Sequence, residues 1–98
     1  MQTLAQLRSG ELKGTKRLTL CENLTSFPEE IFELAETLEV LDLSHNALTH
    51  LPENISKLTS LRIAFFSYNR FTHIPSFLGC ENLTMLGFKG NEIEVFDE

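Results

Sequence analysis

The clearest pattern of apolar and polar positions along the chain lies between Leu38 and Pro52. It has the form L-x-x-L-x-L-x-x-N-x-L-x-x-L, and the residues that fill it are Leu38, Leu41, Leu43, Asn46, Leu48 and Leu51. Because Leu41 and Leu43 are two residues apart, they point to one face of a short predicted strand. Asn46 falls at the following turn, where an amide side chain can hydrogen-bond to the backbone of neighbouring turns. The stretch therefore predicts one strand-and-turn unit.

The same unit recurs in register along most of the chain. It starts again at Leu61, 23 residues after Leu38, and once more at Leu83, 22 residues after Leu61. An earlier copy starts at Thr15 and lacks one residue after its asparagine. We expect the turn asparagines of the four copies to form a ladder of side chains; they are Asn23, Asn46, Asn69 and Asn91. We predict one domain, with an N-terminal cap over residues 1–14 and repeats over 15–37, 38–60, 61–82 and 83–98.

Repeats of this length, each with one strand and one short return segment, predict an α/β solenoid. We expect a short parallel β-sheet on its concave face and short helices or 3-10 turns on its convex face. Each return segment is expected to bury a pair of apolar residues, and these pairs are Ile31 with Leu34, Ile55 with Leu58, and Leu78 with Cys80. The chain start predicts a helical cap, because Thr3 and Gln6 fit a capping box. Leu4, Leu7 and Leu12 are expected to face the core from this cap.

The fourth repeat is short, because the sequence stops before a return segment begins. Four apolar side chains are then left without a predicted cover, namely Leu86, Phe88, Ile93 and Phe96. Bare apolar surface beside an unpaired strand edge favours association. We therefore expect the chain to be part of a longer protein, and the alternative is self-association through this end.

Two stretches resemble a known repeat family. LEVLDLSHNALTHLPENISKLTSL and LRIAFFSYNRFTHIPSFLGCENL are similar to the typical cytoplasmic class of leucine-rich repeat. The run LAQLRSGELKGTKRLTL, followed by LTSFPEEIFELAETLEVLDLSHNALTHLP, also resembles the start of a bacterial family in which such repeats precede a protein-kinase-like domain. The resemblance implies a recognition module. It carries over no catalytic residue, because the sequence contains no G-x-G-x-x-G, H-R-D or D-F-G motif.

Composition and charge narrow the range of partners. The formal net charge of −6 argues against nucleic acid and against anionic membrane surfaces. No apolar run approaches the ~20 residues of a membrane span, and the chain start has no apolar signal core. The two cysteines, Cys21 and Cys80, are predicted to lie too far apart for a disulfide. We therefore expect a cytoplasmic protein whose partner is another protein or a peptide.

The strand side chains that do not enter the core are the candidate site. Nine of them form an apolar and aromatic patch with a charged rim on the predicted concave face: Arg17, Val40, Asp42, His45, Ile63, Phe65, Tyr68, Met85 and Lys89. Aromatic anchors with a polar rim are typical of protein interfaces, so we expect Phe65 and Tyr68 to be the anchors. The alternative is that these residues only favour the strand conformation.

Histidines and glutamates outside the strands are the remaining candidates for chemistry. His50 and His73 occupy the same position in successive repeats, but no third ligand is evident, so we expect surface histidines and no metal or other cofactor. Five glutamates between Glu29 and Glu39 are expected to form a solvated convex surface, with a basic partner as the alternative. The leading hypothesis is a non-catalytic protein-interaction module. The alternative is that the chain is the targeting or regulatory arm of a larger enzyme, and the expected enzyme is a protein kinase.

Overall fold

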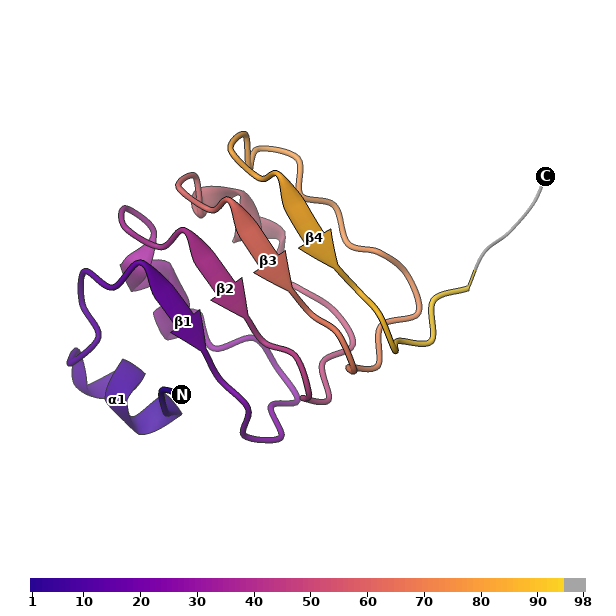
Figure 1. Cartoon of the computed structure of the whole chain (residues 1–98), viewed down its shortest axis with the longest axis horizontal. Helices are drawn as coiled ribbons and strands as arrows, with labels where there is room; N and C mark the ends of the chain where they lie inside the picture. The colour runs from indigo at the N-terminus through magenta and orange to yellow at the C-terminus, as the bar shows by residue number, and fades with distance from the viewer. Residues whose placement is uncertain (95–98) are drawn as a thin grey trace.

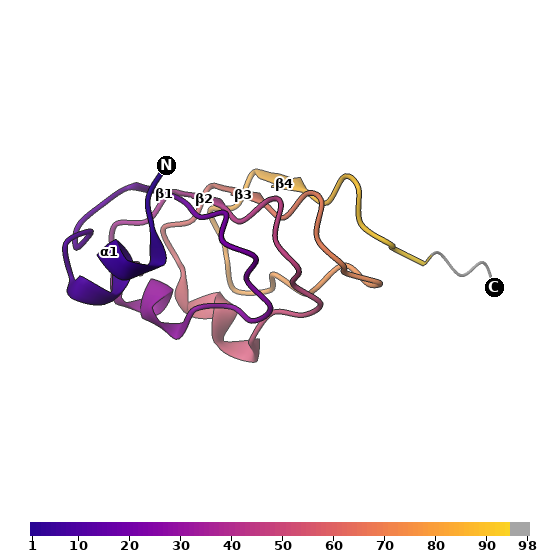
Figure 2. The ribbon, with the colours of Figure 1, turned by 90° about the horizontal axis from the view of Figure 1, so that it is seen from below.

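The computed structural model describes residues 1–94, and these form a stack of four strands with helical segments behind it (Figure 1). The elements are α1 (Leu4–Ser9), β1 (Arg17–Thr19), η1 (Glu29–Leu34), β2 (Val40–Asp42), η2 (Glu53–Lys57), β3 (Ile63–Phe65) and β4 (Met85–Gly87), where η denotes a 3-10 helix. The strands are parallel and follow the order β1-β2-β3-β4. Figure 2 shows η1 and η2 on the side opposite the sheet. The predicted α/β solenoid with a parallel sheet is confirmed.

The strand register sets which side chains enter the core. The central residue of each strand lies beside the central residue of the next, and this inward column is Leu18, Leu41, Ala64 and Leu86. Leu18, Leu41 and Ala64 are fully buried. The small side chain of Ala64 is followed two residues later by Phe66, which is also fully buried. A larger residue at the second inward position therefore offsets the volume missing at the first, as close packing requires.

The asparagine ladder ties each repeat to the one before it. The Asn69 Nδ2 atom donates to the carbonyls of Leu43 and Phe66 at 2.9 and 3.0 Å, and its Oδ1 accepts from the Leu48 N–H at 2.9 Å. Asn46 and Asn91 bond in the same way to the turns that precede them. Each amide thus satisfies backbone groups that the turn leaves without strand partners, and Asn69 is itself buried.

Asn23 was expected in this ladder, and the structure corrects that prediction. Its side chain is exposed, and its backbone has φ +56°. The same positive φ occurs at His45 and Tyr68, one residue before the ladder position. The shortened turn of the first repeat therefore leaves out the ladder position itself. The physical reason is that ladder asparagines bond backward, and the element before the first repeat is the helix α1 rather than another turn.

The N-terminal segment closes the β1 edge of the sheet. Gln2 bonds to this edge through its side-chain amide: its Nε2 donates to the Arg17 carbonyl at 2.8 Å, and its Oε1 accepts from the Thr19 N–H at 2.9 Å. Its own N–H donates to the Thr19 carbonyl at 3.2 Å. Thr3 and Gln6 form the predicted capping box. Leu7 is buried, so the predicted helical cap is confirmed.

Leu4 and Leu12 of the cap also pack against the core.

The third return segment differs from its prediction. Leu78 was expected to be buried, but it is 88% exposed, and Phe77 packs against the core in its place. The Cys80 N–H donates to the Phe77 carbonyl as the Leu58 N–H does to the Ile55 carbonyl. Phe77 is therefore equivalent to Ile55. The segment is one residue shorter than its neighbour, and this shifts its inward positions.

Aromatic rings fill the core near the last strand. Phe66 contacts Phe71, Phe77 and Phe88, with ring centroids 5.9, 6.0 and 5.4 Å away. Phe88 is half-buried and closes the cluster from the last repeat. Of the four side chains expected at the uncovered end, Leu86 is 37% exposed, Phe88 and Ile93 are half-buried, and Phe96 lies outside the described residues. Among the described strands β4 has one strand neighbour, so its outer edge is open.

The ladder predicts a large stability difference between two asparagines. Asn69→Ala leaves the buried Leu48 N–H without its acceptor and removes one of the two amide donors from each of the Leu43 and Phe66 carbonyls, so we expect it to lower the free energy of unfolding by about 3 kcal/mol. Asn23→Gly, which removes the same side chain outside the ladder at a positive φ that glycine adopts without strain, should change it by less than about 0.5 kcal/mol. Urea unfolding followed by circular dichroism measures both, and equal losses would contradict the ladder's role.

Candidate functional site

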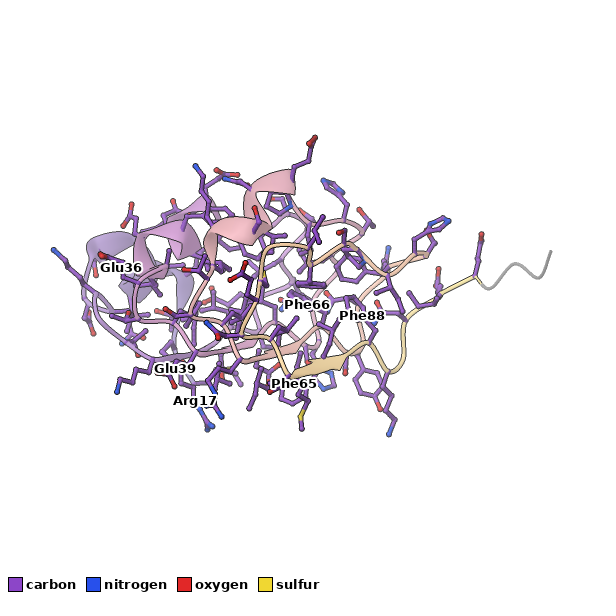
Figure 3. The ribbon with its side chains drawn as sticks, turned by 90° about the horizontal axis from the view of Figure 1, so that it is seen from above. Arg17, Glu36, Glu39, Phe65, Phe66 and Phe88 are labelled. Carbon is purple, nitrogen blue, oxygen red and sulfur yellow. The ribbon has the colours of Figure 1, made fainter. Side chains whose placement is uncertain are left out.

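The nine predicted site residues all belong to the strands or to the turns that follow them. We call the surface formed by the outward side chains of β1 to β4 the sheet face. Figure 3 shows Arg17 and Phe65 projecting on this side, whereas Phe66 and Phe88 point into the interior. The register places Arg17 beside Val40, Ile63 and Met85 in one row. Asp42 and Phe65 lie side by side in the next row, between Thr19 and Gly87.

An aromatic pair forms the edge of the sheet face beyond the strand ends. The rings of His45 and Tyr68 are stacked, with centroids 4.7 Å apart and planes 14° apart. Both residues have positive φ, at +63° and +56°. The His45 N–H donates to the Ser67 carbonyl, and the Tyr68 N–H donates to the Lys89 carbonyl. These bonds tie each turn to the turn of the next repeat. Tyr68 is 45% exposed, so the stack offers a ring surface that a ligand can contact.

Two glycines of the fourth repeat make room for the anchors, and the sequence analysis missed them. A Cβ on Gly87 would lie 2.8 Å from the Phe65 ring, and a Cβ on Gly90 would overlap the Tyr68 ring. Both aromatic side chains therefore lie over glycine instead of projecting freely. The available signal was that Gly87 and Gly90 fill the same repeat positions as Phe65 and Tyr68.

The charged side chains surround an apolar strip. Val40 and Ile63 are half-buried, and Met85 is 52% exposed at the last strand. The Asp42 carboxylate accepts from the Ser44 N–H at 2.9 Å, so it stabilises the turn as well as facing solvent. Arg17 and Lys89 are exposed at opposite ends of the face. The apolar strip thus fills most of one row of the sheet face, and Asp42 lies beside Phe65 in the next row.

The cysteines offer no catalytic arrangement among the described residues. The Cys21 thiol is exposed and donates to the backbone carbonyl of His45 at 3.3 Å, which leaves the imidazole out of the contact. Cys80 is buried, and burial raises the pKa of its thiol above the ordinary value. Its protonated form is favoured there, which makes it a poor nucleophile.

Residues 1–94 contain neither a metal-binding cluster nor a helix that could span a membrane. This part of the chain contains no group of three histidine, cysteine, aspartate or glutamate side chains that could hold a metal ion. None of its helices is both long enough and apolar enough to cross a bilayer.

Comparison with known sequences identifies the repeat. Residues 13–71 match the family model described as Leucine rich repeat. The Leucine-rich repeat-containing G-protein coupled receptor 5A of Xenopus laevis is 31% identical over 93 residues, which cover 94% of this chain and 9% of that protein. Toll-like receptor 8 of Homo sapiens is 38% identical over 74 residues, which cover 74% of this chain and 7% of that protein. The chain spans less than a tenth of the length of the curated relatives it matches.

These relatives bear on the narrower resemblance drawn from the sequence. They are receptors by name, and neither they nor the family match support a link to a protein-kinase-like domain. They give no support to a specifically cytoplasmic class either. The family match covers the repeats from the first strand through the third.

The glycine beneath Tyr68 predicts a specific substitution effect. Gly10 and Gly90 both have positive φ, but only Gly90 has a neighbouring ring at its Cβ position. We expect Gly10→Ala to lower the free energy of unfolding by about 1 kcal/mol and Gly90→Ala by at least about 2 kcal/mol. In a Tyr68→Ala background the Gly90→Ala cost should fall to that of Gly10→Ala, as measured by urea unfolding. An unchanged cost in that background would show that the ring does not depend on the glycine.

Proposed function

The chain belongs to the leucine-rich repeat family, and from that premise we propose that it is a non-catalytic interaction module that binds a polypeptide partner on its sheet face. Proteins of this kind commonly use the strand side of the solenoid as an extended binding surface. The observation that carries the proposal is the pair of anchors, Phe65 and Tyr68, each seated over a glycine. Their position is already set before a ligand arrives.

The physical argument rests on the cost of binding. A flexible side chain loses conformational freedom when it is fixed at an interface, and this loss reduces affinity. Tyr68 is restrained by His45 on one side and Gly90 on the other, so little freedom remains for it to lose. Partly exposed aromatic groups of this type are enriched among the residues that dominate binding energy. The apolar strip of Val40, Ile63 and Met85 adds contact area beside them.

The identity of the whole protein is a separate matter. The similar proteins are receptors by name, and the present chain matches only a small part of each. We propose a protein or peptide as its partner, with no role for nucleic acid, in keeping with the net charge of −6. A cytoplasmic location stays a prediction, with which the two free cysteines are compatible. The kinase-arm alternative is not favoured by any match.

The anchors predict the outcome of a peptide selection. Peptides selected on this chain from a random displayed library should lose at least tenfold in affinity with Phe65→Ala and again with Tyr68→Ala, about 1.4 kcal/mol each. Tyr68 is the single tyrosine in a chain without tryptophan, so its fluorescence reports directly on binding to the wild-type protein. Titration calorimetry measures the affinity of the variants.

The matched control is Glu33→Ala, which removes an exposed side chain from η1 on the opposite side of the molecule. It should leave the affinity within twofold. Circular dichroism checks that each variant is folded. If binding survives both anchor substitutions in folded protein, the sheet face is not the binding surface.

We propose self-association through the β4 end as a second function, because the two edges of the sheet differ. Gln2 satisfies the backbone at the β1 edge, whereas within residues 1–94 no strand pairs with the outer edge of β4, and Leu86 is partly exposed beside it. A second copy that pairs its own β4 there would cover both features.

Sedimentation velocity tests this second proposal. The weight-average mass should rise as the concentration increases from micromolar to millimolar, and Leu86→Glu should weaken the association at least tenfold. Ala5→Glu introduces the same charge on an exposed position of α1 at the opposite end, and it should leave the association unchanged. A monomer at every concentration would exclude the proposal.

A further inference from the structure

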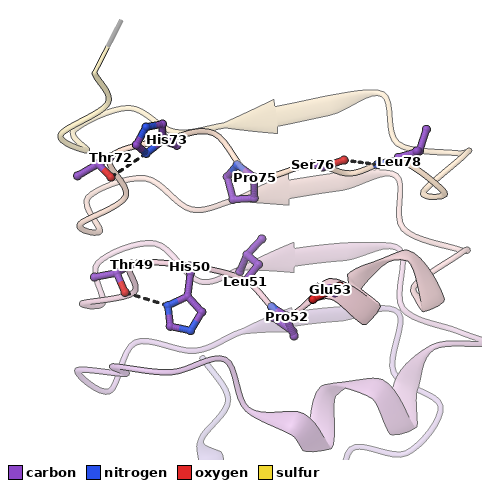
Figure 4. Close-up of a pocket in the computed structure, with 10 residues that line it drawn as sticks. All are labelled: Thr49, His50, Leu51, Pro52, Glu53, Thr72, His73, Pro75, Ser76 and Leu78. Carbon is purple, nitrogen blue, oxygen red and sulfur yellow. Dashed lines mark hydrogen bonds between the residues drawn. The ribbon is translucent and has the colours of Figure 1, made fainter.

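A second concave surface lies away from the sheet face, where the chain descends from the asparagine turns toward the return segments. We call it the return groove. It lies between the second and third repeats, has a volume of about 560 Å³, and is lined by residues from 49–53 and 72–78 (Figure 4). A smaller hollow of about 120 Å³ lies between the first and second repeats. His50 and Pro52 line both, so the two hollows adjoin and cross three repeats.

One wall of the return groove has a repeated polar arrangement. The Thr49 hydroxyl lies 3.0 Å from the His50 Nδ1 atom, and the Thr72 hydroxyl lies 3.0 Å from the His73 Nδ1 atom. Figure 4 shows the two pairs one above the other on the same side of the groove. Each hydroxyl holds its imidazole in one orientation. The wall thus presents equivalent, oriented side chains at successive repeats.

The floor of the return groove is apolar. The residues that line it beside the Thr–His wall are Leu51, Pro52 and Pro75, and Leu78 lies at its far side (Figure 4). Leu78 is 88% exposed, and Ile74 nearby is 59% exposed. These two values are the largest among the exposed leucine and isoleucine side chains of the described residues. A partner that covers this floor would remove apolar surface from water, which favours binding.

The charge of the groove selects the kind of partner. Glu53 lines the larger hollow and Glu29 lines the smaller one, at equivalent positions just after the prolines. Both carboxylates are exposed. Over the described residues, neither hollow is lined by a lysine or an arginine. The groove therefore combines an apolar floor with carboxylates carried at equivalent positions of successive repeats.

We propose that the return groove binds an extended segment of a partner protein in which basic and apolar residues alternate. The apolar side chains lie on Leu51, Pro75 and Leu78, and the basic side chains reach Glu29 and Glu53. The spacing of the lysines along the partner segment need not equal the spacing of the carboxylates along the groove. Lysine side chains are long and flexible, so they can make up the difference. This site is separate from the sheet face, so both can be occupied at once.

The test uses a defined peptide, an acetylated and amidated Lys-Leu-Lys-Leu-Lys segment, added to ¹⁵N-labelled protein. We expect saturable chemical-shift changes at the backbone amides of the non-proline residues of 49–53 and 72–78 and none of similar size on β1 to β4. Replacing the lysines of the peptide by glutamate should abolish these changes, and replacing its leucines by serine should weaken binding at least threefold. Absence of saturable changes with the lysine peptide would overturn the proposal.

Protein variants separate the groove from the general negative charge of the chain. Glu29→Gln with Glu53→Gln should weaken binding about fivefold to tenfold. Glu33→Gln with Glu36→Gln removes the same charge from exposed positions outside the groove lining and should weaken it less than twofold. Equal losses from both pairs would show non-specific attraction and overturn the site. Phe65→Ala should leave this binding unchanged, so its outcome is independent of the sheet-face proposal.

Discussion

The structure depends on one polar interaction inside an otherwise apolar stack, the backward hydrogen bonds of the ladder asparagines. A parallel sheet of three-residue strands satisfies few backbone groups, and the turns beyond the strands would leave N–H and carbonyl groups buried without partners. Asn46, Asn69 and Asn91 supply these partners from the following repeat. The leucine core provides most of the favourable free energy, but the amides determine that repeats stack at a single register.

Much of this architecture follows from the spacing of residues in the sequence. Leucines two residues apart identify the inward strand positions, and a repeat of 22 or 23 residues aligns them between strands. Spacing alone did not reveal that Asn23 has no turn behind it to bond. It also placed Leu78 in the core, because a segment one residue shorter than its neighbour can be aligned in two ways. The exposure of Leu78, the packing of Phe77 and the hydrogen bond from the Cys80 N–H to the Phe77 carbonyl distinguish them.

The candidate surfaces show a similar division. Phe65 and Tyr68 could be placed on the sheet face from their position between inward residues. Their restraint is harder to predict, because the equivalent glycines of the next repeat show only that space is free and not that a ring lies over it. Gly87 and Gly90 matter through the rings that lie over them. The return groove was also outside the reach of the pattern, since it forms between the descending segments of neighbouring repeats and not within one.

The closure of the β1 edge by Gln2 has a consequence for how these repeats can be exchanged as modules. The amide of a single side chain takes the place of a neighbouring peptide group, and the shortened turn at Asn23 needs no predecessor. The first repeat is therefore specialised as a starting unit. Transferred to the middle of an array, it would leave the preceding turn without an amide partner. The second repeat carries Asn46 and would fit there. The repeats of this chain are therefore similar in length, but they cannot exchange positions freely.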